Sequence, residues 1–129
     1  MERRWYKVSG GRINIGGFRD MFPEGFVYVI PDKLKIAKEY HVFLLVSSIG
    51  TPGKETKIRK DGRIHVPRET LEKSGLSDGM DTVYIPRSNN ITIWNPENYR
   101  EFIRDGSEYV KTLKGRDRGI FNSILDDSL

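Results

Sequence analysis

Residues 57–94 constrain the fold most, because strand, turn and helix signals follow one another there without a gap. Apolar and basic residues alternate on both sides of Asp61-Gly62, from Lys57 to Arg59 and from Arg63 to Val66. Alternation at a period of two places the apolar residues on one face of a strand and the basic residues on the other. An Asp-Gly pair between two such runs predicts a tight hairpin turn.

A short helix and a second strand pair follow this turn. Pro67 predicts the helix start, since proline fixes φ and needs no amide partner in the first turn. Gly75 predicts a left-handed helix end, with Leu76 as the hydrophobic contact that usually accompanies it. Residues 82–85 and 91–94 then predict a β-hairpin. The resulting order is β-β-α-β-β.

This series resembles the swapped-hairpin DNA-binding family that includes AbrB, MraZ and SpoVT. The family pattern is a basic strand, a Gly-Arg-hydrophobic-x-hydrophobic-Pro segment, a short helix ending in Gly-Leu or Gly-Ile, and a final hairpin. The residues that match it are Gly62, Arg63, Ile64, Val66, Pro67, Gly75, Leu76, Ser77 and Gly79. The run from Ile91 to Phe102 is most similar to MraZ, in which a strand ending in Trp leads into an aromatic-rich helix.

The resemblance implies both a fold and a function. The implied fold is mainly β with short α elements: an AbrB-like barrel of two swapped-hairpin repeats, followed by short C-terminal helices. The implied function is a sequence-specific DNA-binding transcriptional regulator. Its expected partners are double-stranded DNA and further copies of the chain, in a dimer or larger homo-oligomer.

An internal repeat divides the chain as follows: residues 1–50 are a degenerate first swapped-hairpin repeat, 54–95 the second repeat, and 96–129 a C-terminal helical extension. The first repeat also opens with a basic strand, a glycine turn and Gly-Arg-Ile. Residues 27–31 parallel 82–86, so 34–36 are expected to pair with 27–31. A deletion falls on the helix of the first repeat, which is expected to be short or lost. The alternative is that two unrelated hairpins merely look alike.

The remaining elements are one buried strand and a C-terminal helical region. Residues 41–47 are apolar without alternation, which predicts a strand covered on both faces. Asn95 is a good helix N-cap before Pro96. Asp105-Gly106 is expected to interrupt the helix, with a second helical run after it around Tyr109.

The basic residues suggest DNA contact through β-hairpins. The candidates are Arg12, Lys57, Arg59, Lys60, Arg63, His65 and Arg68. Arg12 and Arg63 follow matching turns and are the best candidates for base reading, because arginine can bond guanine bidentately. Lys57, Lys60 and Arg68 are the candidates for phosphate contacts. The alternative is that these side chains only solvate an exposed sheet edge and discourage aggregation.

A C-terminal apolar stripe lies beyond a loosened Gly-Arg-Asp-Arg-Gly segment. Its residues are Ile120, Phe121, Ile124 and Leu125. Antitoxins of the same superfamily carry a tail that folds against a toxin protein, so one alternative function is an antitoxin of a toxin–antitoxin pair. The other alternative is a helix that closes a homo-oligomer interface.

Composition excludes several kinds of chemistry. The chain has no cysteine and two isolated histidines, so it offers neither a disulfide framework nor a metal-ligand cluster, and no cofactor is expected. No nucleophile motif is present, and the glycine-rich segment at residues 8–17 lacks the ending of a phosphate loop. An enzyme or ligand-binding barrel and single-strand binding through Trp5-Tyr6 remain the other hypotheses. The net charge of +4 permits an acidic partner. We expect a cytoplasmic, nucleoid-associated protein without a membrane segment.

Overall fold

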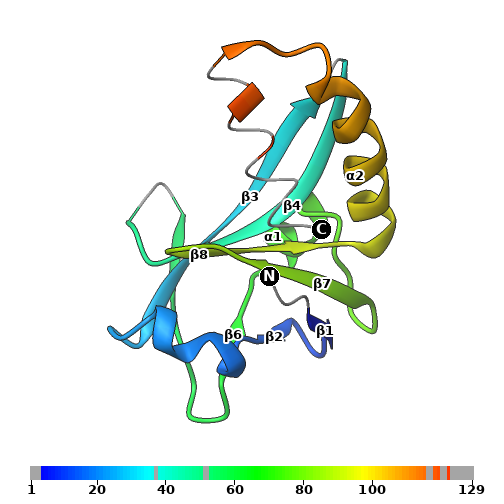
Figure 1. Cartoon of the computed structure of the whole chain (residues 1–129). Helices are drawn as coiled ribbons and strands as arrows, with labels where there is room; N and C mark the ends of the chain where they lie inside the picture. Colours follow the sequence, from blue (N-terminus) through cyan, green and yellow to red (C-terminus); the bar gives the residue numbers. More distant parts are fainter. Residues whose placement is uncertain (1–3, 37, 51–52, 116–117, 120–121, 123–129) are drawn as a thin grey trace.

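The computed structural model describes residues 4–36, 38–50, 53–115, 118–119 and 122. In these ranges the chain is mainly β, as predicted, with two antiparallel sheets and a short helix next to a longer one (Figure 1). The predicted closed barrel is wrong. Six strands form an open sheet and two form a separate ribbon, so the described strands do not close on themselves.

The elements fall into a first half and a second half. The first half contains β1 (Arg4–Lys7), β2 (Arg12–Asn14), the 3-10 helix η1 (Gly16–Met21), β3 (Phe26–Ile36) and β4 (Glu39–Ser47). The second half contains β5 (Lys54–Lys57), β6 (Arg63–His65), α1 (Arg68–Lys73), β7 (Asp81–Pro86) and β8 (Asn90–Trp94), and α2 (Pro96–Val110) follows it. The six-stranded sheet has the order β1-β7-β8-β4-β3-β5, and β2 pairs with β6.

The two halves exchange strands. The first strand of the first half, β1, pairs with β7 of the second half, while β5, the first strand of the second half, pairs with β3 of the first. The central strands β4 and β8 pair around Leu45 opposite Thr92, and β2 and β6 pair around Ile13 opposite Ile64. Neither half could therefore complete its strand pairing alone.

The turn at Asp61-Gly62 forms as predicted, but its flanking strands do not pair with each other. Gly62 has a φ of +84°, and its N–H donates to the carbonyl of Arg59 at 2.9 Å. Next to the turn, the N–H of Arg59 donates to the carbonyl of Arg63 at 2.9 Å. Further from the turn, the N–H of Ile58 donates to Gly25 and the N–H of Val66 donates to Gly11. The simple hairpin expected here is thus replaced by pairing with the other half.

The prediction that residues 34–36 pair with 27–31 is also wrong. Both segments belong to the single long strand β3, and its partner is β4, with Leu34 opposite His41 and Val29 opposite Val46. Pro31 stays within the strand, opposite Leu44. The counterpart of β8 in the first half is therefore β4.

Two apolar clusters cover the two faces of the six-stranded sheet. On one face, Leu44 and Val46 of β4 pack in a cluster that includes Ile13 and Ile64 of the ribbon. On the other face, the ring of Trp94 stacks on Phe43 of β4 and on Phe102 of α2. The prediction that β4 is covered on both faces is confirmed, since successive side chains of a strand point to opposite sides.

Helix α1 ends as the sequence predicted. The N–H of Leu76 donates to Leu71 at 2.9 Å, the N–H of Gly75 donates to Glu72, and Gly75 has a φ of +77°. These two bonds form a Schellman motif, which glycine allows without strain. A side chain at Gly75 would also collide with Asn98, because a Cβ there would lie 2.8 Å from the Asn98 Nδ2 atom.

The other helices confirm one prediction and correct another. The helix of the first half is indeed short, a kinked 3-10 helix over Gly16–Met21. In contrast, α2 runs without interruption through Asp105-Gly106, and Gly106 is buried within it. A helical glycine costs about 1 kcal/mol relative to alanine. Packing of Phe102 before it and Tyr109 after it against the sheet outweighs that cost.

Asn95 joins the start of α2 to the end of α1, and its removal tests this junction. Its Oδ1 accepts from the N–H of Glu97 at 2.8 Å, and its Nδ2 donates to the carbonyl of Gly75 at 3.1 Å. We expect Asn95→Ala to lower the free energy of unfolding in urea by about 1–2 kcal/mol, because a cap bond and a junction bond are lost together. Ser88→Ala, on an exposed loop residue, is the control. Equal stability of Asn95→Ala and the control would contradict the junction.

Candidate functional site

The ribbon formed by β2 and β6 presents a polar face made of four side chains. Arg12 lies opposite His65, and Asn14 lies opposite Arg63. The central pair, Ile13 and Ile64, is 1% and 0% exposed. Because side chains alternate along a strand, these isoleucines face the core and the four polar residues face outward. Arg63 and His65 are exposed, whereas Arg12 and Asn14 are partly buried.

A basic turn adjoins the ribbon. Arg59 and Lys60 are exposed in the turn that leads into β6. Arg19 of η1 reaches across and donates from Nη2 to the carbonyl of Arg59 at 2.6 Å and to that of Lys60 at 3.1 Å. The contact fixes the turn and adds a third guanidinium or ammonium group to it. Figure 1 shows the ribbon and this turn together at the end of the molecule away from α2.

The sequence prediction missed Arg19 and Asn14. Arg19 gives no local signal, because its contacts depend on η1 lying beside a turn forty residues away. Asn14 could have been found, since it alternates with two buried isoleucines in the segment Ile13–Ile15 and must therefore face outward. Its Oδ1 accepts from the N–H of Gly16 at 2.9 Å, which leaves its NH₂ group as a donor.

The structure places two of the predicted residues away from the polar face. Lys57 lies on β5, the edge strand of the six-stranded sheet, opposite Phe26. Arg68 lies on α1, where its Nε donates to Glu72 Oε1 at 3.0 Å. A second pair follows on the same helix, and the hydrogen bond from Lys73, reinforced by its charge, lowers the pKa of Glu69. Arg68 is therefore a weaker source of free positive charge than the sequence suggested.

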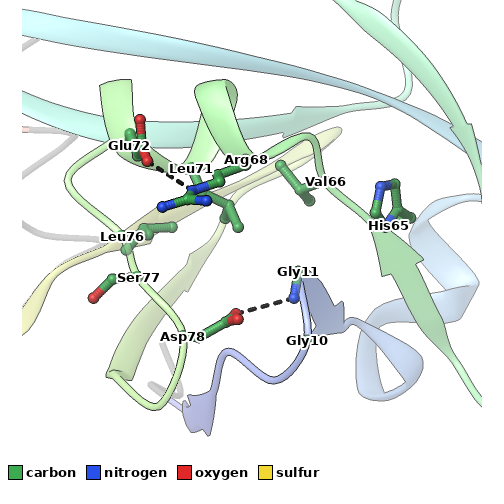
Figure 2. Close-up of a pocket in the computed structure, with 10 residues that line it drawn as sticks. All are labelled: Gly10, Gly11, His65, Val66, Arg68, Leu71, Glu72, Leu76, Ser77 and Asp78. Carbon is green, nitrogen blue, oxygen red and sulfur yellow. Dashed lines mark hydrogen bonds and ion pairs between the residues drawn. The ribbon is translucent and has the colours of Figure 1, made fainter.

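Two surface hollows flank the ribbon, one at each end. The turn-side hollow has a volume of about 340 Å³ and is lined by Arg19, Phe22, Pro23, Gly25, Ile58, Arg59 and Lys60. The helix-side hollow, about 540 Å³, is lined by Gly10, Gly11, His65, Val66, Arg68, Leu71, Glu72, Leu76, Ser77 and Asp78 (Figure 2). Its floor is apolar, and its rim carries Arg68 bonded to Glu72, and Asp78 bonded to the N–H of Gly11.

The side chains that line the two hollows do not form a metal-ligand cluster. The described residues contain no group of three or more His, Asp or Glu side chains placed to hold a metal ion. His65 is exposed on the ribbon, while His41 is 4% exposed on the other face of the sheet, with Nε2 at 3.7 Å from Asp105 Oδ2. The two histidines thus lie on different faces of the sheet and do not belong to one site.

Further findings concern the membrane, the tail and known proteins. No helix in the described part of the chain is both long and apolar enough to cross a bilayer. The predicted apolar stripe at Ile120, Phe121, Ile124 and Leu125 lies outside the described residues.

Comparison with protein-family models and with curated proteins found no match to this sequence.

Replacement of Arg19 tests whether it fixes the basic turn. We expect Arg19→Ala to accelerate hydrogen–deuterium exchange at the N–H groups of Gly62 and Arg63, because two bonds that hold the turn carbonyls are lost. Arg100→Ala, an exposed arginine on α2, is the matched control. Unchanged exchange at the turn in Arg19→Ala would show that the turn holds its shape without this contact.

Proposed function

We propose that this protein is a sequence-specific DNA-binding transcriptional regulator and that the ribbon is its DNA-reading surface. The observation that carries the proposal is the polar face itself, with Arg12, Asn14, Arg63 and His65 side by side over two buried isoleucines. A two-stranded ribbon fits the major groove of B-DNA, where base edges are distinguishable. The buried isoleucines beneath the ribbon hold in place the two strands that carry these side chains.

The roles divide between bases and phosphates. Arg12 and Arg63 are diagonal neighbours across the ribbon, which separates them by about 7–8 Å. Each can bond the O6 and N7 atoms of a guanine. Arg59 and Lys60, one step outside the ribbon, fit the flanking phosphates, and Lys57 on the sheet edge is a more remote phosphate contact. His65 and Asn14 add donors between the arginines.

The strand exchange supports the resemblance to AbrB, MraZ and SpoVT. We propose that residues 1–50 and 54–95 are two swapped-hairpin repeats and that 96–129 form an extension. In support, β1 of the first half corresponds to β5 of the second, and β3 corresponds to β7. The pairing of β1 with β7 is therefore equivalent to the pairing of β5 with β3. In the ribbon, Arg12 corresponds to Arg63 and Asn14 corresponds to His65. The pair Arg12–His65 is therefore equivalent to the pair Asn14–Arg63. Such symmetry is expected of duplicated units and not of two unrelated hairpins.

The proposal includes assembly and location. Because one chain supplies both partners of every exchanged strand pair, a homo-oligomer is not needed to complete the pairing. A dimer or larger assembly would instead engage several DNA sites at once, which raises avidity. Regulation of transcription from DNA would place the protein in the cytoplasm with the nucleoid. The alternative of an antitoxin whose tail binds a toxin depends on residues outside the described ranges and gains no support from the described ones.

Replacement of Arg63 tests base reading. We expect Arg63→Ala to weaken binding to a preferred duplex by about 1–3 kcal/mol and to relax the preference at one base position, because a bidentate contact is lost. Affinities for a panel of singly substituted duplexes, measured by fluorescence anisotropy, would show this. Arg100→Ala on α2 should bind as the wild type does. If Arg63→Ala kept the affinity and the preference of the wild type, the assignment of this arginine would be wrong.

Replacement of Lys60 tests phosphate contact. We expect Lys60→Ala to weaken binding evenly across sequences and to reduce the slope of log K against log salt by about one, because one fewer counterion is released. Lys38→Ala, an exposed lysine at the distant end of the β3–β4 hairpin, is the control. A slope equal to that of the control would remove Lys60 from the interface.

A further inference from the structure

The ribbon is nearly symmetric, but its two ends are not. Exchange of the two halves matches Arg12 to Arg63, and it matches the turn at Gly10-Gly11 to the turn over residues 59–62. A ribbon with equal ends would place equal charges over the two flanking phosphate backbones. The chain instead has the uncharged pair Gly10-Gly11 in one turn, whereas the other turn has two basic residues, Arg59 and Lys60, and one acidic residue, Asp61.

The end with the basic turn carries more positive charge than negative charge. Arg19, Arg59 and Lys60 all line the turn-side hollow. The same turn carries one exposed carboxylate, Asp61, whose Oδ1 accepts from the N–H of Arg63 at 3.0 Å, so the three basic groups outnumber it. The guanidinium of Arg19 bonds the turn carbonyls, so the turn is held in place before any ligand arrives. Gly62 packs so closely on Gly16 that a Cβ at Gly62 would lie 2.7 Å from the Gly16 Cα atom. The backbone that carries Arg59 and Lys60 is thus held in place by these contacts.

The opposite end carries more negative charge than positive charge. The helix-side hollow is lined by two carboxylates, Glu72 and Asp78, and by one arginine, Arg68. Arg68 is already bonded to Glu72 at 3.0 Å, and Asp78 Oδ1 occupies the N–H of Gly11, which would otherwise be available to an anion. Figure 2 shows both bonds at the rim of the hollow. A phosphate backbone placed here would meet negative charge, and like charges repel.

We propose that the ribbon binds duplex DNA in one orientation only, with its basic turn on a phosphate backbone and its helix-side end free of phosphate contacts. This inference rests on the proposed function and adds direction to it. The site read by one chain is then a directional sequence whose two halves are unequal, although Arg12 and Arg63 are equivalent in the ribbon.

Affinity cleavage tests the orientation directly. The chain has no cysteine, so a single introduced cysteine can carry an iron chelate that cuts nearby DNA. Asp20→Cys marks the turn-side end and Ser77→Cys the helix-side end, and both positions are exposed. On a duplex selected from a random pool, each label should cut on only one side of the site, and the two labels should cut on opposite sides. Cleavage on both sides by each label would overturn the inference while leaving DNA binding intact.

Charge variants supply a second measurement that does not depend on labels. Glu72→Gln with Asp78→Asn removes both carboxylates, yet each amide keeps an acceptor oxygen for its present partner. Because no carboxylate then neutralises Arg68, we expect this double variant to gain a phosphate contact through this arginine, so that the salt slope increases by about one. In the wild-type background, Arg68→Ala should leave the salt slope unchanged. A slope lower by about one in Arg68→Ala would show that both ends of the ribbon already contact phosphate, and it would contradict the inference.

No binding to any duplex at low salt would overturn the proposed function, and this inference with it.

Discussion

The contact between Ile13 and Ile64 determines which side of the ribbon faces outward. The two side chains lie opposite each other in the register and are almost completely buried. A slip of one residue in either strand would turn an isoleucine outward and one of its polar neighbours inward, which the burial of apolar surface opposes. Truncation of such a residue to alanine typically costs about 2–5 kcal/mol. The arrangement of the polar face is therefore a consequence of core packing.

The exchange of strands then attaches the ribbon to the rest of the molecule. The N–H of Ile15 donates to Gly62 and the N–H of Val66 donates to Gly11, so each half holds the turn of the other. Arg19 adds two bonds on one side and Asp78 adds one on the other. The basic side chains thus project from a surface whose backbone is fixed by long-range bonds, which is the condition for reading a base without a large loss of entropy on binding.

Sequence patterns predicted the features that depend on neighbouring residues. The end of α1 at Gly75, the hairpin of β7 and β8 and the burial of β4 all follow from local spacing. The features that were missed depend on distant contacts. Alternation around Asp61-Gly62 predicts two strands and a turn, but it cannot say that each strand pairs with the other half of the chain. Likewise, Gly106 reads as a helix break until the packing of α2 on the sheet is known.

The central claim is that the ribbon and its basic turn contact DNA, and residue-resolved NMR during a titration with duplex DNA tests it most directly. The account predicts that amide chemical shifts change most at residues 12–14, 59–60 and 63–65. It also predicts that the shifts of α2, on the other face of the sheet, hardly change, and that the changes shrink as salt is raised. Changes centred on α2, or no change at low salt, would contradict the account.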